Sequence, residues 1–154
     1  MTTTATFRTR LASTDPAALT GTGPAADDLR RSLLEGARIA VIDPGYVYKR
    51  FLYERARELG AELVLVGDAS GWARKLVDEG VAAAIVQAGL GGDPDNAARA
   101  AIAALGDEAE RIDGVLTFWE DAVPAAARVA GTLRLPGMSP AAADGARSLS
   151  LIHI

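Results

Sequence analysis

The sequence predicts an α/β protein with a Rossmann-like open parallel sheet of about four strands and helices on both faces. Three observations lead to this prediction. Short apolar runs recur along the chain, and each is followed by a segment with helical periodicity. The runs are continuous and rich in β-branched residues, which is typical of strands covered on both faces. Each strand–helix unit takes roughly 25 to 30 residues, the length of a right-handed crossover.

Turn residues set the limits of each expected element. Each apolar run ends at glycine, proline or acidic residues, and strands are expected at 38–43, 62–66, 81–87 and 114–118. Capping residues or an early proline precede the helices, which are expected at 46–59, 71–79, 94–105 and 121–133. A shorter helix is expected at 25–35, before the first strand.

Composition excludes several classes of function. The formal net charge of -4 gives no electrostatic case for a nucleic-acid or membrane partner. The chain contains no cysteine, so disulfides and thiolate metal sites are excluded, and its one histidine, His153, makes a histidine-based metal site or catalytic triad untenable. No apolar run approaches the roughly 20 residues of a membrane-spanning helix. A cytoplasmic location is therefore the default expectation.

Ligands of open parallel sheets bind beyond the carboxyl ends of the strands, so the candidate residues lie there. Asp43 is expected to bind a ligand or magnesium, or to cap the Asp-Pro-Gly loop that includes Gly45. Lys49 lies near a helix N-terminus, where a cation is unfavourable, so it is expected either to face an anion or to lie on a solvated face. Glu120 is expected to accept a substrate ammonium group or to cap the helix that follows.

Other strand ends offer weaker candidates. The glycines at 89–92 are interpreted either as a phosphate-binding turn or as a simple turn before a proline-started helix. Trp72 and Trp119 are expected to line a pocket or to pack in the interior. The G-x-G-x-x-G dinucleotide fingerprint and the G-x-x-x-x-G-K-[ST] phosphate loop are both absent from the sequence.

Three motifs carry a resemblance to a known family. They are K-R-F-x-x-E-R-A-x-E-L-G from Lys49, G-V-x-T-F-x-E-D-x-V-P-x-A-A-R-x-A from Gly114, and L-P-G-x-S-P from Leu135. In this order, the sequence from about 38 to 148 resembles the N-terminal, or pre-ATP-grasp, domain of ATP-grasp carboxylate–amine ligases, of the carnosine-synthase-like and dipeptide-ligase branch.

The resemblance implies a reaction and a set of substrate-binding residues. Family members use ATP and Mg²⁺ to convert a carboxylate into an acyl phosphate, which an amine then attacks. The implied substrate-binding residues are Glu120, Asp43, Gly45, Tyr46 and Lys49, which would border the cleft for a small carboxylate or amino-acid substrate. ATP and Mg²⁺ would bind in an ATP-grasp core of the full-length enzyme, which is compatible with a homodimer, and neither would bind to this fragment. The alternative is a stand-alone small-ligand-binding or receiver-like regulatory module.

The chain is expected to divide into four segments. Residues 1–36 are expected to form a flexible leader with a short helix, and 37–136 the pre-ATP-grasp domain. Residues 137–148 are expected to start a connection to a missing ATP-grasp core, so the fragment is expected to be inactive alone. The ending at 149–154 is interpreted as a non-native tail.

Overall fold

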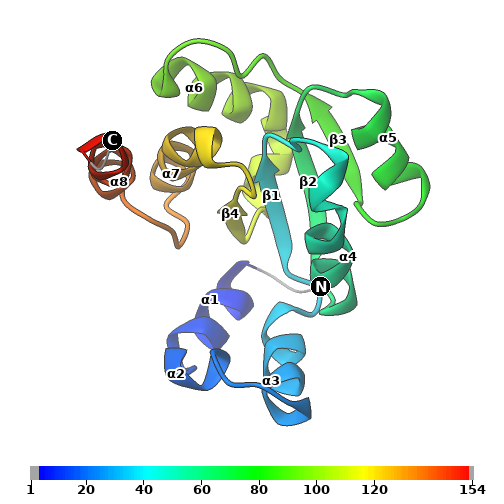
Figure 1. The fold of residues 1–154 in the computed structure, drawn as a ribbon. Coiled ribbons are helices and arrows are strands. Elements are labelled where there is room, and N and C mark those ends of the chain that lie inside the picture. Colours follow the sequence, from blue (N-terminus) through cyan, green and yellow to red (C-terminus); the bar gives the residue numbers. More distant parts are fainter. Residues whose placement is uncertain (1–3, 153–154) are drawn as a thin grey trace.

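The fold is a four-stranded parallel sheet with helices on both faces, as the sequence predicts (Figure 1). The computed structural model describes residues 4–152, and their side chains from 7 to 146. The strands are β1 (Arg38–Ile42), β2 (Glu62–Gly67), β3 (Ala84–Gln87) and β4 (Gly114–Leu116). They lie in the order β3-β2-β1-β4, and every neighbouring pair is parallel.

Helices join consecutive strands. After the three N-terminal helices α1 (Thr4–Ala12), α2 (Pro16–Leu19) and α3 (Pro24–Leu34), the helical elements are η1 (Val47–Lys49), α4 (Arg50–Glu58), α5 (Gly71–Asp78), α6 (Pro94–Leu105), η2 (Gly106–Arg111), η3 (Glu120–Ala122), α7 (Val123–Thr132) and α8 (Pro140–Ile152). The expected caps are confirmed: the side chain of Ser70 accepts from the α5 backbone, and that of Asp93 accepts from the α6 backbone.

Alternate residues of the central strand β1 enter two separate cores. Ile39 and Val41 join a core with α3, α4 and α5, whereas Ala40 and Ile42 join a core with α6 and α7. Both faces of the strand are therefore covered, which explains why its sequence is continuously apolar.

The third strand is shorter than expected, because it begins at Ala84 rather than at residue 81. Val81 and Ala82 are buried in the core on the α4 and α5 side, and both of their amides donate to the carbonyl oxygen of Leu76 in α5. These bonds close the turn after α5, so the two residues cannot yet pair with β2.

The N-terminal stretch differs from the expectation of a flexible leader with one short helix. The expected helix is present as α3, but α1 and α2 precede it. Phe7 of α1 is buried, at 6% exposure, in the same core as Leu33 of α3. The sequence of α1 has little helical periodicity, so it did not predict a helix. The helix depends on this tertiary packing rather than on an amphipathic pattern.

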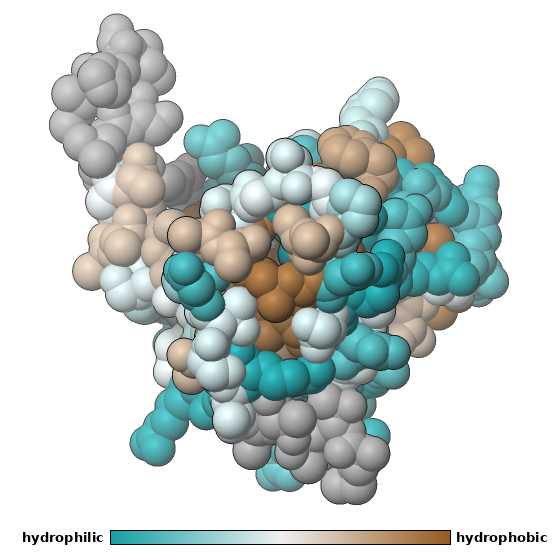
Figure 2. Space-filling model, turned by 90° about the horizontal axis from the view of Figure 1, so that it is seen from below, coloured by the Kyte–Doolittle hydropathy of each residue, from teal (hydrophilic) through white to brown (hydrophobic). Residues whose placement is uncertain are grey.

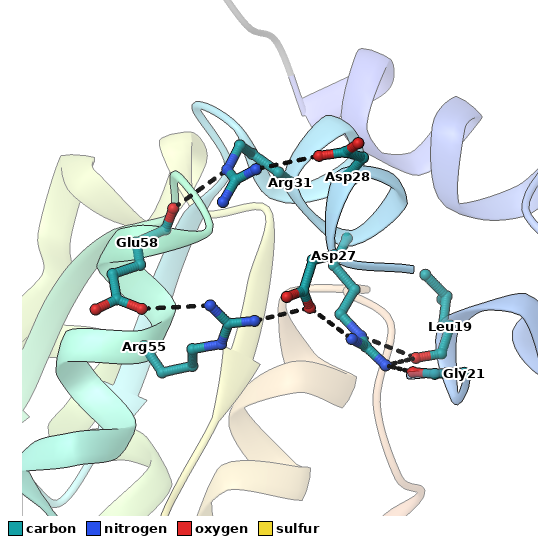
Figure 3. Close-up of polar contacts among 8 residues, drawn as sticks. Leu19, Gly21, Asp27, Asp28, Arg31, Arg55 and Glu58 are labelled. Atoms are coloured by element: carbon teal, nitrogen blue, oxygen red, sulfur yellow. Dashed lines mark hydrogen bonds and ion pairs between the residues drawn. The ribbon is translucent and has the colours of Figure 1, made fainter. Parts of the chain in front are cut away.

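An ion-pair cluster fastens these helices to the sheet domain (Figure 3). The Asp27 carboxylate of α3 lies 2.8 Å from Arg30 Nη1 and 2.8 Å from Arg55 Nη2 of α4. The Arg30 hydrogen bond first, and that of Arg55 second, hold the pKa of Asp27 below its ordinary value. Arg30 also donates to the carbonyl oxygens of Leu19 and Gly21, so one cluster joins α2, α3 and α4.

Seen from the side of these helices, the molecule exposes an apolar region at the centre of the face, between mostly polar surroundings (Figure 2).

A second ion-pair cluster lies in the C-terminal part of the chain, where Arg128 of α7 binds α8 through its guanidinium. Arg128 Nη2 lies 2.9 Å from the Asp144 carboxylate, and Arg128 Nε lies 2.7 Å from that of Asp95 in α6. These partners, Asp144 first, raise the pKa of Arg128, so three helices share one permanently charged contact.

Candidate functional site

The connections reverse direction between β1 and β4, and this reversal locates the candidate site. From β1 the chain passes through α4 to β2 and through α5 to β3, and α6 then carries it back to β4 on the other side of β1. Ligands of open α/β sheets bind in the crevice beyond the carboxyl ends of the strands at such a switch point. The loops that leave β1, β2 and β4 meet at this edge.

A hollow of about 470 Å³ lies at this edge. It is lined by the loop 43–48 after β1, by Asp68, Ser70 and Trp72 around the start of α5, and by Trp119 after β4. Of the residues that the sequence nominated, five line this hollow: Asp43, Gly45, Tyr46, Trp72 and Trp119. The hollow falls within the 300–1,000 Å³ range that is typical of small-molecule sites.

Hydrogen bonds fix the loop that forms one wall of the hollow. The Tyr53 hydroxyl, which is completely buried, donates to the Pro44 carbonyl oxygen over 2.7 Å. Trp72 Nε1 donates to the Gly45 carbonyl oxygen over 2.9 Å, and the Gly45 amide donates to Asp43 Oδ1 over 2.9 Å. The loop is thus attached to α4, to α5 and to itself, which is the preorganisation that a binding wall needs.

Asp43 carries out the capping role that the sequence analysis gave as one of two alternatives. Its carboxylate accepts from Gly45, and its backbone has φ 60°, a left-handed conformation that aspartate tolerates in turns. Burial first, and the nearby Asp43 charge second, raise the pKa of the Tyr53 phenol. The phenol therefore stays protonated and donating across the neutral range.

Glycine is required twice in this wall. Gly45 has φ 64°, and a Cβ there would lie 3.1 Å from Cε3 of Trp119. Gly67, with φ 152°, would bring a Cβ to 2.8 Å from Pro44 Cδ. Both positions let the loop approach its neighbours more closely than a side chain would permit.

Lys49 and Arg50 contact the protein rather than an open anion site. Lys49 donates to the carbonyl oxygen of Phe118, and its Nζ lies 4.9 Å from the Trp119 ring centroid. Arg50 pairs with Glu54 and Glu79, and these carboxylates raise the pKa of the guanidinium. Lys49 is therefore adjacent to the hollow through Trp119 but is not among the residues that line it.

Glu120 lines neither of two hollows, although its sequence neighbours Trp119 and Asp121 each line one of them. A second hollow of about 280 Å³ lies on the other side of the β1 end, where Asp43, Gly91 and Asp121 are among its lining residues. Glu120 is exposed, and η3 and α7 both begin without a side-chain cap, so the capping alternative for Glu120 is wrong.

Sequence reasoning gave too little weight to the aromatic side chains of the site. Trp72 and Trp119 both line the larger hollow, and Tyr46 meets Trp119 edge to face with ring centroids 5.2 Å apart. The exposed Tyr48 lines it as well. A usable signal was that both tryptophans follow strand ends within a few residues.

Neither a metal-ligand cluster nor a membrane-spanning helix is found in the described part of the chain. Among the side chains described, from 7 to 146, no three of the histidine, cysteine, aspartate and glutamate types gather as a metal site would require. None of the helices described there is long and apolar enough to cross a membrane.

The sheet order and the hollow define an open α/β domain with a cavity of small-molecule size at its switch point. Residues 53–137, more than half of the chain, match the family model of the ATP-grasp N-terminal domain. The chain belongs to this family, and the resemblance found in its motifs is confirmed.

Relatives of known function agree with this assignment. The chain is 32% identical over 146 residues to human carnosine synthase 1, which covers 86% of this chain and 17% of the relative. It is 32% identical over 127 residues to carnosine synthase 1 from Gallus gallus, covering 79% of this chain and 13% of that protein. The chain therefore spans less than a fifth of the length of either relative.

A solved structure shares the fold. The L-amino acid ligase from Bacillus licheniformis superposes with a TM-score of 0.57 at 24% identity, covering 72% of this chain and 27% of the ligase chain. This likeness confirms the α/β architecture.

Proposed function

We propose that this chain is the substrate-side N-terminal domain of an ATP-dependent ligase that joins a carboxylate to an amine, in amino-acid or dipeptide-type ligation. The main support for this proposal is the family match over 53–137, together with a preformed hollow at the edge of the sheet where that family's substrate cleft is expected. In the proposed reaction the carboxylate is activated as an acyl phosphate before the amine attacks.

Glu120 is proposed to accept the ammonium group of an amino-acid substrate. Its side chain is exposed and makes no hydrogen bond or ion pair within the described residues, and its sequence neighbours Trp119 and Asp121 each line one of the two hollows. An unpaired carboxylate at a strand end can form a charge-assisted hydrogen bond with an incoming ammonium group. Asp43, Gly45 and Tyr46 are proposed to border the same substrate, with Lys49 supporting them through Trp119.

ATP and Mg²⁺ are proposed to bind in an ATP-grasp core of the longer enzyme. The side chains described between residues 7 and 146 include no cluster of three metal-ligand groups, and none of the residues that line the larger hollow is basic. A triphosphate with its metal requires both kinds of group. The chain alone is accordingly proposed to be inactive.

A chimera tests the proposal. This chain replaces the aligned segment of human carnosine synthase 1, and ATP-dependent carnosine formation is measured against the enzyme lacking that segment. We expect formation to return, and Glu120→Gln to lower kcat/KM about tenfold to a hundredfold, since a charge-assisted hydrogen bond is lost. Glu110→Gln, another exposed acid, serves as the matched control.

Two results would contradict the proposal. The first is a folded, soluble chimera, verified by circular dichroism, with no ligation above the deleted enzyme. The second is ADP release by the isolated chain with any pair of amino acids, which would show that the ATP site does not lie elsewhere.

A further inference from the structure

We infer that the hollow lined by loop 43–48, Asp68, Trp72 and Trp119 is itself a binding site for an organic ammonium cation, in addition to the contact proposed for Glu120. The inference rests on the proposed function in one respect: the cation is taken to be an amine-bearing substrate of the ligase. The argument comes from the aromatic content, the charge and the rigidity of the hollow.

Four aromatic side chains line this hollow, namely Tyr46, Tyr48, Trp72 and Trp119. Tyr46 is 61% exposed and Tyr48 is 85% exposed, so both rings are open to a ligand. Ammonium groups are attracted to the faces of such rings, and aromatic cages are a common means of recognising them. Lys49 already makes this type of contact with Trp119.

The charge of the hollow favours the same ligand. Asp43 and Asp68 are the charged residues that line it, and no lysine, arginine or histidine does so. Asp68 is exposed and makes no hydrogen bond or ion pair with any described residue. Two carboxylates without a lining counter-charge attract a cation and repel an anion such as a phosphate or a carboxylate.

The walls are held in place before a ligand arrives. Trp72 is fixed by its hydrogen bond to the Gly45 carbonyl oxygen. Its ring meets that of Tyr53 edge to face, with the ring centroids 5.7 Å apart. The Gln87 side chain accepts from the amide of Ala69 over 2.8 Å, which positions the loop next to Asp68. A ligand therefore meets a preformed surface and orders only the exposed tyrosines.

The hollow also contains its own reporter. The sequence has two tryptophans, and both line this hollow, so intrinsic fluorescence responds to ligands that bind there. The whole chain is titrated at low salt with pentane-1,5-diammonium, with 1,5-pentanediol and with glutarate. These probes share a five-carbon chain and differ in charge.

We expect a saturable fluorescence change with the diammonium probe at least fivefold tighter than with the diol, and none with glutarate. Asp68→Asn should weaken diammonium binding at least threefold, while Asp78→Asn, which changes the net charge equally at the far end of α5, should leave it unchanged. Trp72→Phe, measured by calorimetry, provides a second variant that retains the packing but loses the Gly45 bond, and it should also weaken binding.

Equal binding of the diol and the diammonium probe would overturn the inference, as would tighter binding of glutarate or equal effects of Asp68→Asn and Asp78→Asn. The result is distinguishable from a failure of the proposed function. An active chimera whose N-terminal chain binds no cation removes only this inference. An inactive chimera whose chain binds the diammonium probe removes only the ligase assignment.

Discussion

The buried hydroxyl of Tyr53 offers the sharpest test of how the site wall is held. Tyr53→Phe removes one oxygen from a completely buried ring and leaves its edge contacts with Trp72 and Phe118 in place. The change deletes the 2.7 Å bond to the Pro44 carbonyl oxygen. The net loss of a hydrogen bond, plus the penalty for an unsatisfied buried carbonyl, is about 2 kcal/mol of unfolding free energy.

Urea unfolding followed by circular dichroism measures this loss. The midpoint should fall with an unchanged m-value, and the melting temperature should drop by about 4 to 8 °C for a chain of this size. Tyr48→Phe is the matched control, because Tyr48 is 85% exposed and its hydroxyl makes no bond within the described residues. A loss below about 0.5 kcal/mol for Tyr53→Phe, or an equal loss for Tyr48→Phe, would refute the reasoning.

The same residue gives a pH prediction with a definite sign. Burial, and then the Asp43 charge, raise the pKa of Tyr53 in the folded state. The unfolded chain therefore releases this proton first, so the contribution to stability is complete below pH ~10 and declines as the pH rises above that value. The decline is at most about 1.4 kcal/mol per pH unit, and the Tyr53→Phe variant should lack it.

Three further predictions concern other contacts. Gly67→Ala should destabilise the fold by about 1–3 kcal/mol in urea unfolding, because the added Cβ would meet Pro44. Gly71→Ala is the control, since the space around Gly71 is open, and it should be neutral or stabilising. Similar losses of stability for the two variants would contradict the close approach of Gly67 to Pro44. Arg128→Met should speed amide hydrogen exchange in α8, with Arg99→Met as control, and unchanged exchange would show that the ion pairs do not hold that helix. Because the pKa of Asp27 is depressed, its contribution to stability is present above pH ~4 and is lost as the pH falls through the folded-state pKa. Asp27→Asn should therefore reduce the loss of stability in acid. An unchanged dependence of stability on acid pH would contradict the role given to the Asp27 ion pairs.

Local signals allowed the sheet to be predicted from the sequence. The run at Arg38–Ile42 is apolar and β-branched, which predicts a strand that is covered on both faces. The Asp-Pro-Gly turn that follows marks where this strand ends. Ser70 and Asp93 are capping residues whose bonds lie within their own helices. Features of this kind depend on a few neighbouring residues, and the sequence contains all of them.

Features that depend on distant residues could not be predicted in this way. Lys49 was expected to face an anion or solvent, yet its ammonium donates to the carbonyl oxygen of Phe118, 69 residues away. Trp72 reaches back 27 residues to Gly45. Such pairings follow from the sheet order, which places the ends of β1, β2 and β4 together, and periodicity does not carry that information.

The central position of β1 has a practical consequence for anyone who prepares this protein. The family match begins at residue 53, inside α4, and so leaves out the strand that is hydrogen-bonded to both β2 and β4. A clone cut to 53–137 would lack β1, so β2 and β3 would remain paired and β4 would have no neighbouring strand. Cloning boundaries are better drawn ahead of α1, so that β1 is retained together with Phe7 of its core and with the Asp27 cluster that joins α2, α3 and α4.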